Sequence, residues 1–169
     1  MLMSDKIFLR DAVKDDCRFI WESANDPAVR AVSFSSDEIP WEVHKVWFEK
    51  KLTEPSTILL LAENEQKEKI GQLRFEKKPE GYVISVSLVE EFRGKGLGSS
   101  LIQLGSEKLF QIFSDADQIN AYIKPENRSS IRSFEKAGYK NAGFATINEE
   151  NDAVLMVKKR NAGSTMQEI

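Results

Sequence analysis

Glycines and basic residues alternate in the middle of the chain, in the run Arg93-Gly94-Lys95-Gly96-Leu97-Gly98. Glycine accepts positive φ angles and lets a ligand approach the backbone closely. An apolar run at 82–89 precedes the glycines and an amphipathic helical pattern follows them. The free N–H groups and the positive dipole end of that helix would therefore point at the glycine turn, which predicts a site for a phosphate or pyrophosphate group.

Two common phosphate motifs do not fit this run. A P-loop needs a lysine beside a hydroxyl residue after its last glycine, whereas Gly96 is followed by Leu97-Gly98-Ser99. The dinucleotide fingerprint needs two residues between its second and third glycines, and one residue separates Gly96 from Gly98. The pattern that fits is Arg93-x-x-Gly96-x-Gly98 after a strand.

A second segment carries an independent pattern near the C-terminus. A strand is predicted at 119–124, and a helix opens after Pro125 and closes at a Gly-aromatic pair. The residues of this segment that bear on function are Asn127, Ser130, Phe134, Gly138 and Tyr139.

Together the two segments resemble the GNAT superfamily of N-acetyltransferases, and the likeness covers roughly the whole chain. The resemblance implies an α/β (α+β) fold with a central, mostly antiparallel sheet split in a V and flanked by helices. It also implies acetyl-CoA as cosubstrate, a primary amine as acceptor and no metal. We expect one domain over 1–160 and a frayed tail over 161–169.

The rest of the chain predicts the elements of such a fold. Strands are expected at 6–9, 57–62, 69–75, 82–89, 141–147 and 153–157. Helices are expected through 19–21, from Pro27, over 41–52 and after the glycine run.

The resemblance assigns roles around the glycine run. Backbone amides would hold the pyrophosphate, the preceding strand would part from its neighbour, and the thioester oxygen would lie against the Leu88 amide, which stabilises a developing negative charge. Asn127 would hold the pantetheine arm, lined by Ser130 and Phe134. The expected cofactor-binding residues are Leu88, Val89, Arg93, Gly94, Lys95, Gly96, Leu97, Gly98, Ser99, Asn127, Ser130 and Phe134. Phe134 stands where the family often has a tyrosine acid, so the thiolate proton would come from water, Ser130 or Tyr139, or catalysis would be weak.

Acetyl transfer to an amine also needs a base, because an alkylamine with a pKa of about 10.4 is charged at neutral pH. His44 is the only histidine of the chain, and we predict that it is catalytic. The alternative is a packed or solvent-facing ring, as for Trp41 and Phe48 on the same helix, which we expect to be mostly core. The other candidates for the base are Glu42, Glu76, Glu90 and Glu91.

The N-terminal half resembles GNAT enzymes that acetylate nucleotide-linked amino sugars in pseudaminic-acid-type synthesis and, more loosely, ribosomal-protein N-terminal acetyltransferases. The resemblance rests on Asn25-Asp26-Pro27-x-Val29-Arg30, Ser33 and His44-x-x-Trp47-Phe48. It implies that Asn25, Arg30 and Trp47 bind the acceptor. Arg30 would pair with an acceptor phosphate, or it is an exposed arginine without a role.

Composition limits the alternatives. The 169 residues carry 24 Lys+Arg and 27 Asp+Glu, a net charge of −3, which argues against a general nucleic-acid surface. A single cysteine, Cys17, excludes an internal disulfide and indicates a reducing cytoplasm. No apolar run is long enough for a membrane span, and the N-terminus lacks the pattern of a signal peptide. We expect a monomer or homodimer.

Two other classes of protein remain open. A CoA-binding regulatory module would share the glycine run but lack turnover. A protein-recognition domain that docks through the helix at 41–52 would need an exposed apolar patch and no glycine run.

Overall fold

The computed structural model describes residues 6–148 and 151–161. The strands are β1 (Phe8–Asp11), β2 (Thr57–Glu63), β3 (Lys69–Lys78), β4 (Gly81–Leu88), β5 (Gln118–Ile123), β6 (Lys140–Asn148) and β7 (Asn151–Lys159). The α-helices are α1 (Cys17–Ala24), α2 (Pro27–Val32), α3 (Trp41–Thr53), α4 (Leu97–Ile112) and α5 (Arg128–Lys136). Two 3₁₀ turns, Lys14–Asp16 and Glu90–Phe92, lead into α1 and into the glycine loop.

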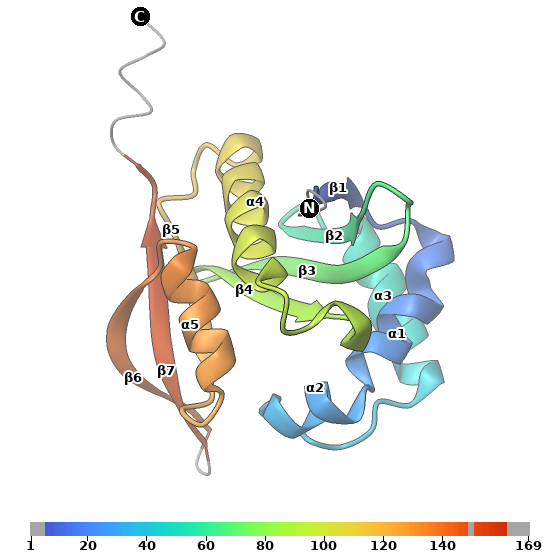
Figure 1. Cartoon of the computed structure of the whole chain (residues 1–169), viewed down its shortest axis with the longest axis horizontal. Helices are drawn as coiled ribbons and strands as arrows, with labels where there is room; N and C mark the ends of the chain where they lie inside the picture. Colours follow the sequence, from blue (N-terminus) through green and yellow to red (C-terminus); the bar gives the residue numbers. More distant parts are fainter. Residues whose placement is uncertain (1–5, 149–150, 162–169) are drawn as a thin grey trace, which may run out of the picture.

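The strands form one seven-stranded sheet in the order β1-β2-β3-β4-β5-β7-β6. Every neighbouring pair is antiparallel except β4 and β5, which run parallel. These two strands pair only at Tyr82 with Ile119 and at Val83 with Asn120. Since β4 continues to Leu88 without further pairing to β5, the sheet opens there, as Figure 1 shows. The predicted fold class, a mostly antiparallel sheet split in a V, is confirmed.

Helices cover the sheet on both faces. α4 lies so close to β3 that a Cβ at Gly105 would come within 2.6 Å of Leu73 Cδ2. On the other face, α1 and α3 pack against Leu59 and Leu61 of β2. β2 is buried on both faces because its neighbours in sequence, such as Leu60, belong to the core under α4, which explains its unbroken apolar run.

Local sequence sets the ends of α2 and α5. Asp26 caps α2 by accepting a hydrogen bond from Ala28 N (2.9 Å), with Pro27 in the first turn. Asn127 caps α5 through a bond from Ser130 N (3.3 Å). Both helix starts agree with the sequence patterns.

The N-terminal prediction was displaced by two residues. The first strand spans Phe8–Asp11 instead of 6–9. Asp16 immediately precedes α1, but its carboxylate does not cap the helix and instead accepts bonds from Arg10 (2.8 Å) and from Val13 N (2.8 Å). These partners lie outside the helix, so a buried ion pair explains the acidic residue there. Of the expected tail over 161–169, all but Asn161 lies outside the described residues.

Candidate active site

The glycine loop joins the end of β4 to the start of α4. Gly94 has φ +73° and Gly96 has φ +78°, the left-handed region that side chains rarely adopt. A Cβ at either position would meet nothing within 4 Å. The loop therefore needs glycine for its backbone conformation, and it leaves open space above the helix start.

The first turn of α4 offers unpaired donors to that space. Gly96 is the N-cap residue and supplies no side-chain bond to the helix. The first amides of an α-helix have no partner within the helix. In α4 these are the amides from Leu97 onward, and the N-cap glycine has no side chain that could accept a hydrogen bond from them. Lys95 extends over the Phe92 ring, with its Nζ 5.6 Å from the ring centroid, and adds positive charge. This arrangement suits a phosphate or pyrophosphate.

Gly98 has a different role from its two neighbours. A Cβ at Gly98 would lie 3.1 Å from Ser133 Oγ and 3.8 Å from Leu88 Cδ1. The third glycine of the motif therefore lets α4 approach α5 and the end of β4, which brings the two predicted functional segments together.

Arg93 links two parts of the molecule. Its Nε donates to Leu88 O (3.0 Å) and its Nη2 forms an ion pair with Asp26 (3.2 Å) at the start of α2. The resemblance implied that Arg93 binds the cofactor, where its charge would face the pyrophosphate. In the structure the guanidinium holds the strand end and the helical layer of α1–α3 in a fixed relation.

Leu88 and Val89, two of the expected cofactor-binding residues, differ in their surroundings. Val89 N donates to Ile70 O (2.9 Å), so this amide is paired with β3 and is not available to the cofactor. Amides alternate direction along an antiparallel strand. Because Val89 N points toward β3, Leu88 N is directed to the other side, toward the opening between β4 and β5. The role of the Leu88 amide stays a prediction that this direction favours, and the Val89 amide instead joins β4 to β3.

The residues of α5 divide between the site and the core. Asn127 uses its Oδ1 for the helix cap, which leaves its amide NH₂ to donate elsewhere. Phe134 is buried at 3% exposure and packs edge-on against Tyr139 at 4.9 Å between ring centroids. Tyr139 bonds to Ser106 Oγ (2.7 Å), and burial raises the pKa of its phenol well above the ordinary value. Because Tyr139 is enclosed in the core and bonded to Ser106, it is poorly placed to reach the thiolate, so water and Ser130 remain as proton donors.

Asn25 and Arg30 hold the segment between α2 and α3. Asn25 exchanges two hydrogen bonds with the backbone of Ile39, at 2.8 and 3.0 Å. Arg30 donates to the carbonyls of Ala24 (2.6 Å) and Ser35 (3.0 Å). Burial lowers the pKa of Arg30. The predicted acceptor-binding side chains are therefore engaged in shaping a loop.

His44 lies inside the layer of α1 and α3. It is 3% exposed, stacks on Trp41 and Phe48, and its Nε2 lies 3.1 Å from Cys17 O. Burial lowers the pKa of His44, and the Cys17 carbonyl offsets only part of this change. These contacts favour the packed alternative over the catalytic one.

A polar strip on β3 and β4 faces the same helical layer. Register pairs Arg74 with Ser85 and Gln72 with Ser87, and cross-strand partners share a face of the sheet. Trp47 of α3 covers this face, with the Arg74 guanidinium 5.0 Å from its ring centroid. Alternation in β4 is typical of a strand with one buried face and one that faces a cleft or solvent, but Arg74 was not identified from the sequence. Its place in an alternating strand was the available indication.

Glu76 ends this strip. Its carboxylate lies 3.0 Å from Lys51 Nζ and 3.6 Å from Arg74 Nε. Burial would raise the pKa of Glu76, but these two cations outweigh it and the pKa is lowered. Glu76 is thus a weak candidate for the base.

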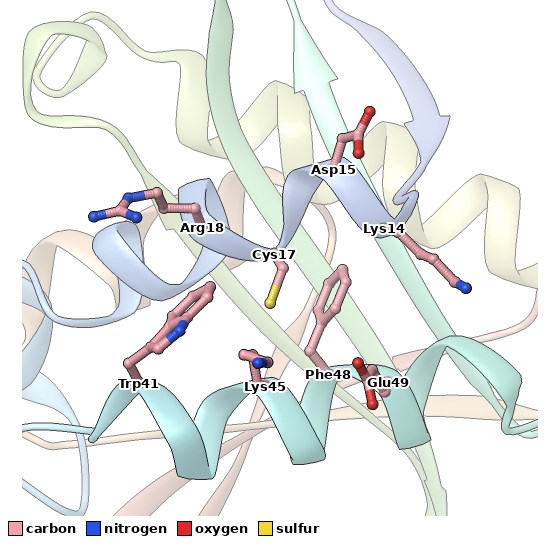
Figure 2. A pocket seen from close by; sticks show the side chains of 8 residues that line it. All are labelled: Lys14, Asp15, Cys17, Arg18, Trp41, Lys45, Phe48 and Glu49. Carbon is pink, nitrogen blue, oxygen red and sulfur yellow. The ribbon is translucent and has the colours of Figure 1, made fainter.

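A separate hollow of about 280 Å³ lies between α1 and α3. Figure 2 shows Cys17 between Trp41 and Phe48 in its wall, with the charged chains around them. None of its lining residues belongs to the glycine loop, α5 or the polar strip. The hollow is therefore distinct from the candidate active site.

Among the described residues, no group of three or more His, Cys, Asp or Glu side chains is placed to hold a metal ion. In the same ranges, no helix is both long and apolar enough to cross a membrane.

Known proteins identify the family of the chain. A family model described as acetyltransferase (GNAT) domain matches residues 6–140. The chain belongs to this family, as the two sequence segments indicated. The particular branches suggested by the N-terminal half remain predictions.

The solved structures that resemble the chain share its fold. Aminoglycoside acetyltransferase AAC(6')-Ib in complex with coenzyme A aligns with a TM-score of 0.79 and 23% identity, over 96% of this chain and 100% of that one. Spermidine N-acetyltransferase from Vibrio cholerae, in complex with CoA and spermine, aligns with a TM-score of 0.80 and 20% identity, over 90% and 95%.

A sequence relative covers a smaller region. Mycothiol acetyltransferase of Corynebacterium aurimucosum is 31% identical over 59 residues, which are 35% of this chain and 19% of that protein. The chain thus spans about a fifth of the length of this relative.

Proposed function

We propose that the protein is an acetyl-CoA-dependent N-acetyltransferase that acts on a primary amine of a small molecule. The observation that carries the proposal is the glycine loop at the mouth of the split sheet. Gly94 and Gly96 leave space where side chains would stand, and the start of α4 points unpaired amides into it. A pyrophosphate fits this cradle.

Different residues of the chain would bind the parts of acetyl-CoA and stabilise the reacting thioester. The amides from Gly94 to Ser99 hold the pyrophosphate, Lys95 adds charge, and the Asn127 amide binds the pantetheine arm. When bound, acetyl-CoA supplies an acetyl group activated as a thioester. The Leu88 N–H, directed into the opening, donates to the carbonyl oxygen and stabilises negative charge on it.

The acceptor would approach from the face of α1 and α3. Asn25 and Arg30 shape the loop that borders this face, and Trp47 covers part of it. Because His44 is enclosed, we assign the amine proton to an ordered water with exit past the exposed Glu90 and Glu91. His44 as the base stays a prediction that kinetics can test.

The acceptor class follows from the resemblance in the N-terminal half. We propose an amino sugar, carried by a nucleotide or another phosphate, as the first class to try, and a protein N-terminus as the second. The setting would be cytoplasmic, with the chain as a monomer or homodimer.

The test is thiol release from acetyl-CoA in the presence of amino sugars, polyamines and N-terminal peptides. We expect acceptor-dependent release, with the acetyl group found on nitrogen by mass spectrometry. Tight acetyl-CoA binding without release for any amine would instead support a regulatory CoA-binding module, for which the buried Phe134 is the favouring observation.

A further inference from the structure

Arg74 has more hydrogen-bonding capacity than its neighbours use. A guanidinium carries five N–H donors. Among the described residues only Ser85 accepts a hydrogen bond from it, from Nη2 at 3.2 Å. Nε is buried without a hydrogen-bond partner, although 34% of the side chain as a whole is exposed. Buried donors are nearly always satisfied in folded proteins, so the unpaired Nε is unusual, and the exposed part of the guanidinium is free to bind an acceptor from outside the chain.

The surrounding charges do not cancel that of Arg74. Glu76 lies 3.6 Å from Arg74 Nε, but it is shared with Lys51 (3.0 Å) and Lys78 (4.0 Å). Lys51 also contacts Glu54 at 2.9 Å. Three cations thus face two carboxylates, and the cluster keeps an excess of positive charge.

Arg74 is placed to contact the part of the acetyl-acceptor molecule that lies away from its reacting amine. Arg74 is paired with Ser85, three residues before Leu88 on β4, a separation of about 10 Å along a strand. Gln72 and Ser87 form the polar pair between these levels. A small molecule can therefore place an amine near Leu88 and another group at Arg74.

The acetyl donor would not occupy this position. α4, whose N-terminus forms the cradle, packs against Leu73 and Phe75 on the opposite face of β3. Trp47 contacts the guanidinium from the α3 side, with its ring centroid 5.0 Å from Arg74 Cζ, which restricts the movement of the side chain. A planar donor fork is the geometry that binds carboxylate and phosphate with two parallel hydrogen bonds.

We propose that Arg74 binds the anionic group, a carboxylate or a phosphate, of an amine acceptor, so that the enzyme selects zwitterionic amines over polycations. The inference rests on the proposed function and narrows its substrate class. It sets this chain apart from its structural neighbours, one of which is solved with spermine, because a polycation at this strip would be repelled by the excess positive charge.

Matched amine pairs test the preference. The pairs are glucosamine 6-phosphate with glucosamine, and 4-aminobutyrate with butylamine, with spermidine as the polycation. We expect kcat/KM for at least one anionic member to exceed that of its partner by roughly tenfold or more, as a charge-assisted bidentate pair allows. The pair that shows the preference tells phosphate from carboxylate. Equal rates within both pairs, or a preference for spermidine, would overturn the proposal.

Variants assign the preference to the side chain. Arg74→Gln should bring the ratio within each pair close to one, mainly through KM. Arg18→Gln is the matched control, because Arg18 is 73% exposed on α1 and lies outside the strip. An unchanged ratio in Arg74→Gln would refute the assignment.

Binding without turnover separates this proposal from the proposed function. Each amine is titrated calorimetrically into protein saturated with CoA, at about 50 mM and about 500 mM salt, where screening of an exposed ion pair differs strongly. We expect the anionic members to bind more tightly, with affinity falling in high salt and in Arg74→Gln. Selective binding without thiol release would support the Arg74 site and reject the acetyltransferase. Thiol release without selective binding would support the acetyltransferase and reject the Arg74 site.

Stability distinguishes a ligand site from a structural arginine. Because the buried Nε has no hydrogen-bond partner and Lys51 and Lys78 remain beside Glu76, Arg74→Met should lower the melting temperature of the free protein by no more than a few degrees. A structural role predicts a larger decrease in melting temperature for Arg74→Met together with unaltered amine selectivity in Arg74→Gln. That pair of results would contradict the proposal.

Discussion

The glycine loop and the helical layer of α1–α3 rely on different kinds of groups. At the loop, the predicted donors are backbone amides, and their availability follows from two glycines and a helix start. In the helical layer, the predicted groups are side chains, and tertiary partners decide whether they are available. Arg30 is engaged by carbonyls and His44 by Cys17. At these two regions, the availability of backbone groups can therefore be predicted from the local sequence more directly than the availability of side chains.

The largest expected effect is at the loop. Gly96→Val would force a branched side chain into φ +78° and place it in the open cradle. We expect acetyl-CoA affinity to fall by about 100-fold or more, ~2.7 kcal/mol, in isothermal titration, with little change in circular dichroism.

Gly143→Val separates strain from obstruction in that experiment. Gly143 has φ +103° in β6 and equally open surroundings, so a side chain costs a similar ~1–2 kcal/mol of backbone strain. It lies outside the loop, and acetyl-CoA affinity should stay as in the unaltered protein. Equal losses in both variants would show that strain alone acts, and the backbone cradle would be rejected.

The fold was predictable from local patterns to a large extent. Alternation in β4, the apolar run of β2 and the caps at Asp26 and Asn127 each follow from nearby residues. Three features did not follow from them. The Val89 bond to β3, the Arg93 bridge to α2 and the unpaired Nε of Arg74 each depend on residues distant in the chain.

A smaller effect is expected at His44, where the two interpretations give different pH dependence. Burial lowers the folded pKa of His44 below the unfolded value of about 6.5. The unfolded state then binds more protons as pH falls below about 6.5, so the free energy of unfolding decreases with acidification. His44→Gln should lose this contribution and cost about 1–3 kcal/mol at pH 8, measured by urea unfolding at several pH values.

Kinetics of the same variant completes the comparison. For a packed histidine, kcat per folded molecule should change by no more than a few-fold. A general base predicts a loss of roughly 100-fold and a shifted acidic limb of the pH–rate profile. Val43→Gln, at a 60% exposed position on the same helix, controls for glutamine in α3. A 100-fold loss of kcat in His44→Gln with normal stability would restore the catalytic interpretation.

The smallest expected effect lies at the contact between the two regions, the Asp26–Arg93 ion pair at 3.2 Å. Asp26→Asn keeps an oxygen for the cap bond from Ala28 N but removes the charge. The two side chains are 24% and 31% exposed, so the pair contributes less than about 1 kcal/mol. Because Arg93 also holds Leu88 O, we expect kcat/KM to fall about two- to five-fold, within that energy.

A double-mutant cycle with Arg93→Gln measures this coupling, and Asp115→Asn, which breaks the exposed Lys77–Asp115 pair, is the control. If the bridge positions Leu88, the two losses in kcat/KM are less than additive, because either variant removes the same link. If Arg93 instead acts on the pyrophosphate, Arg93→Gln weakens acetyl-CoA binding, Asp26→Asn does not, and the losses add. The second result would return Arg93 to the role that the sequence assigned to it and leave the two regions mechanically independent.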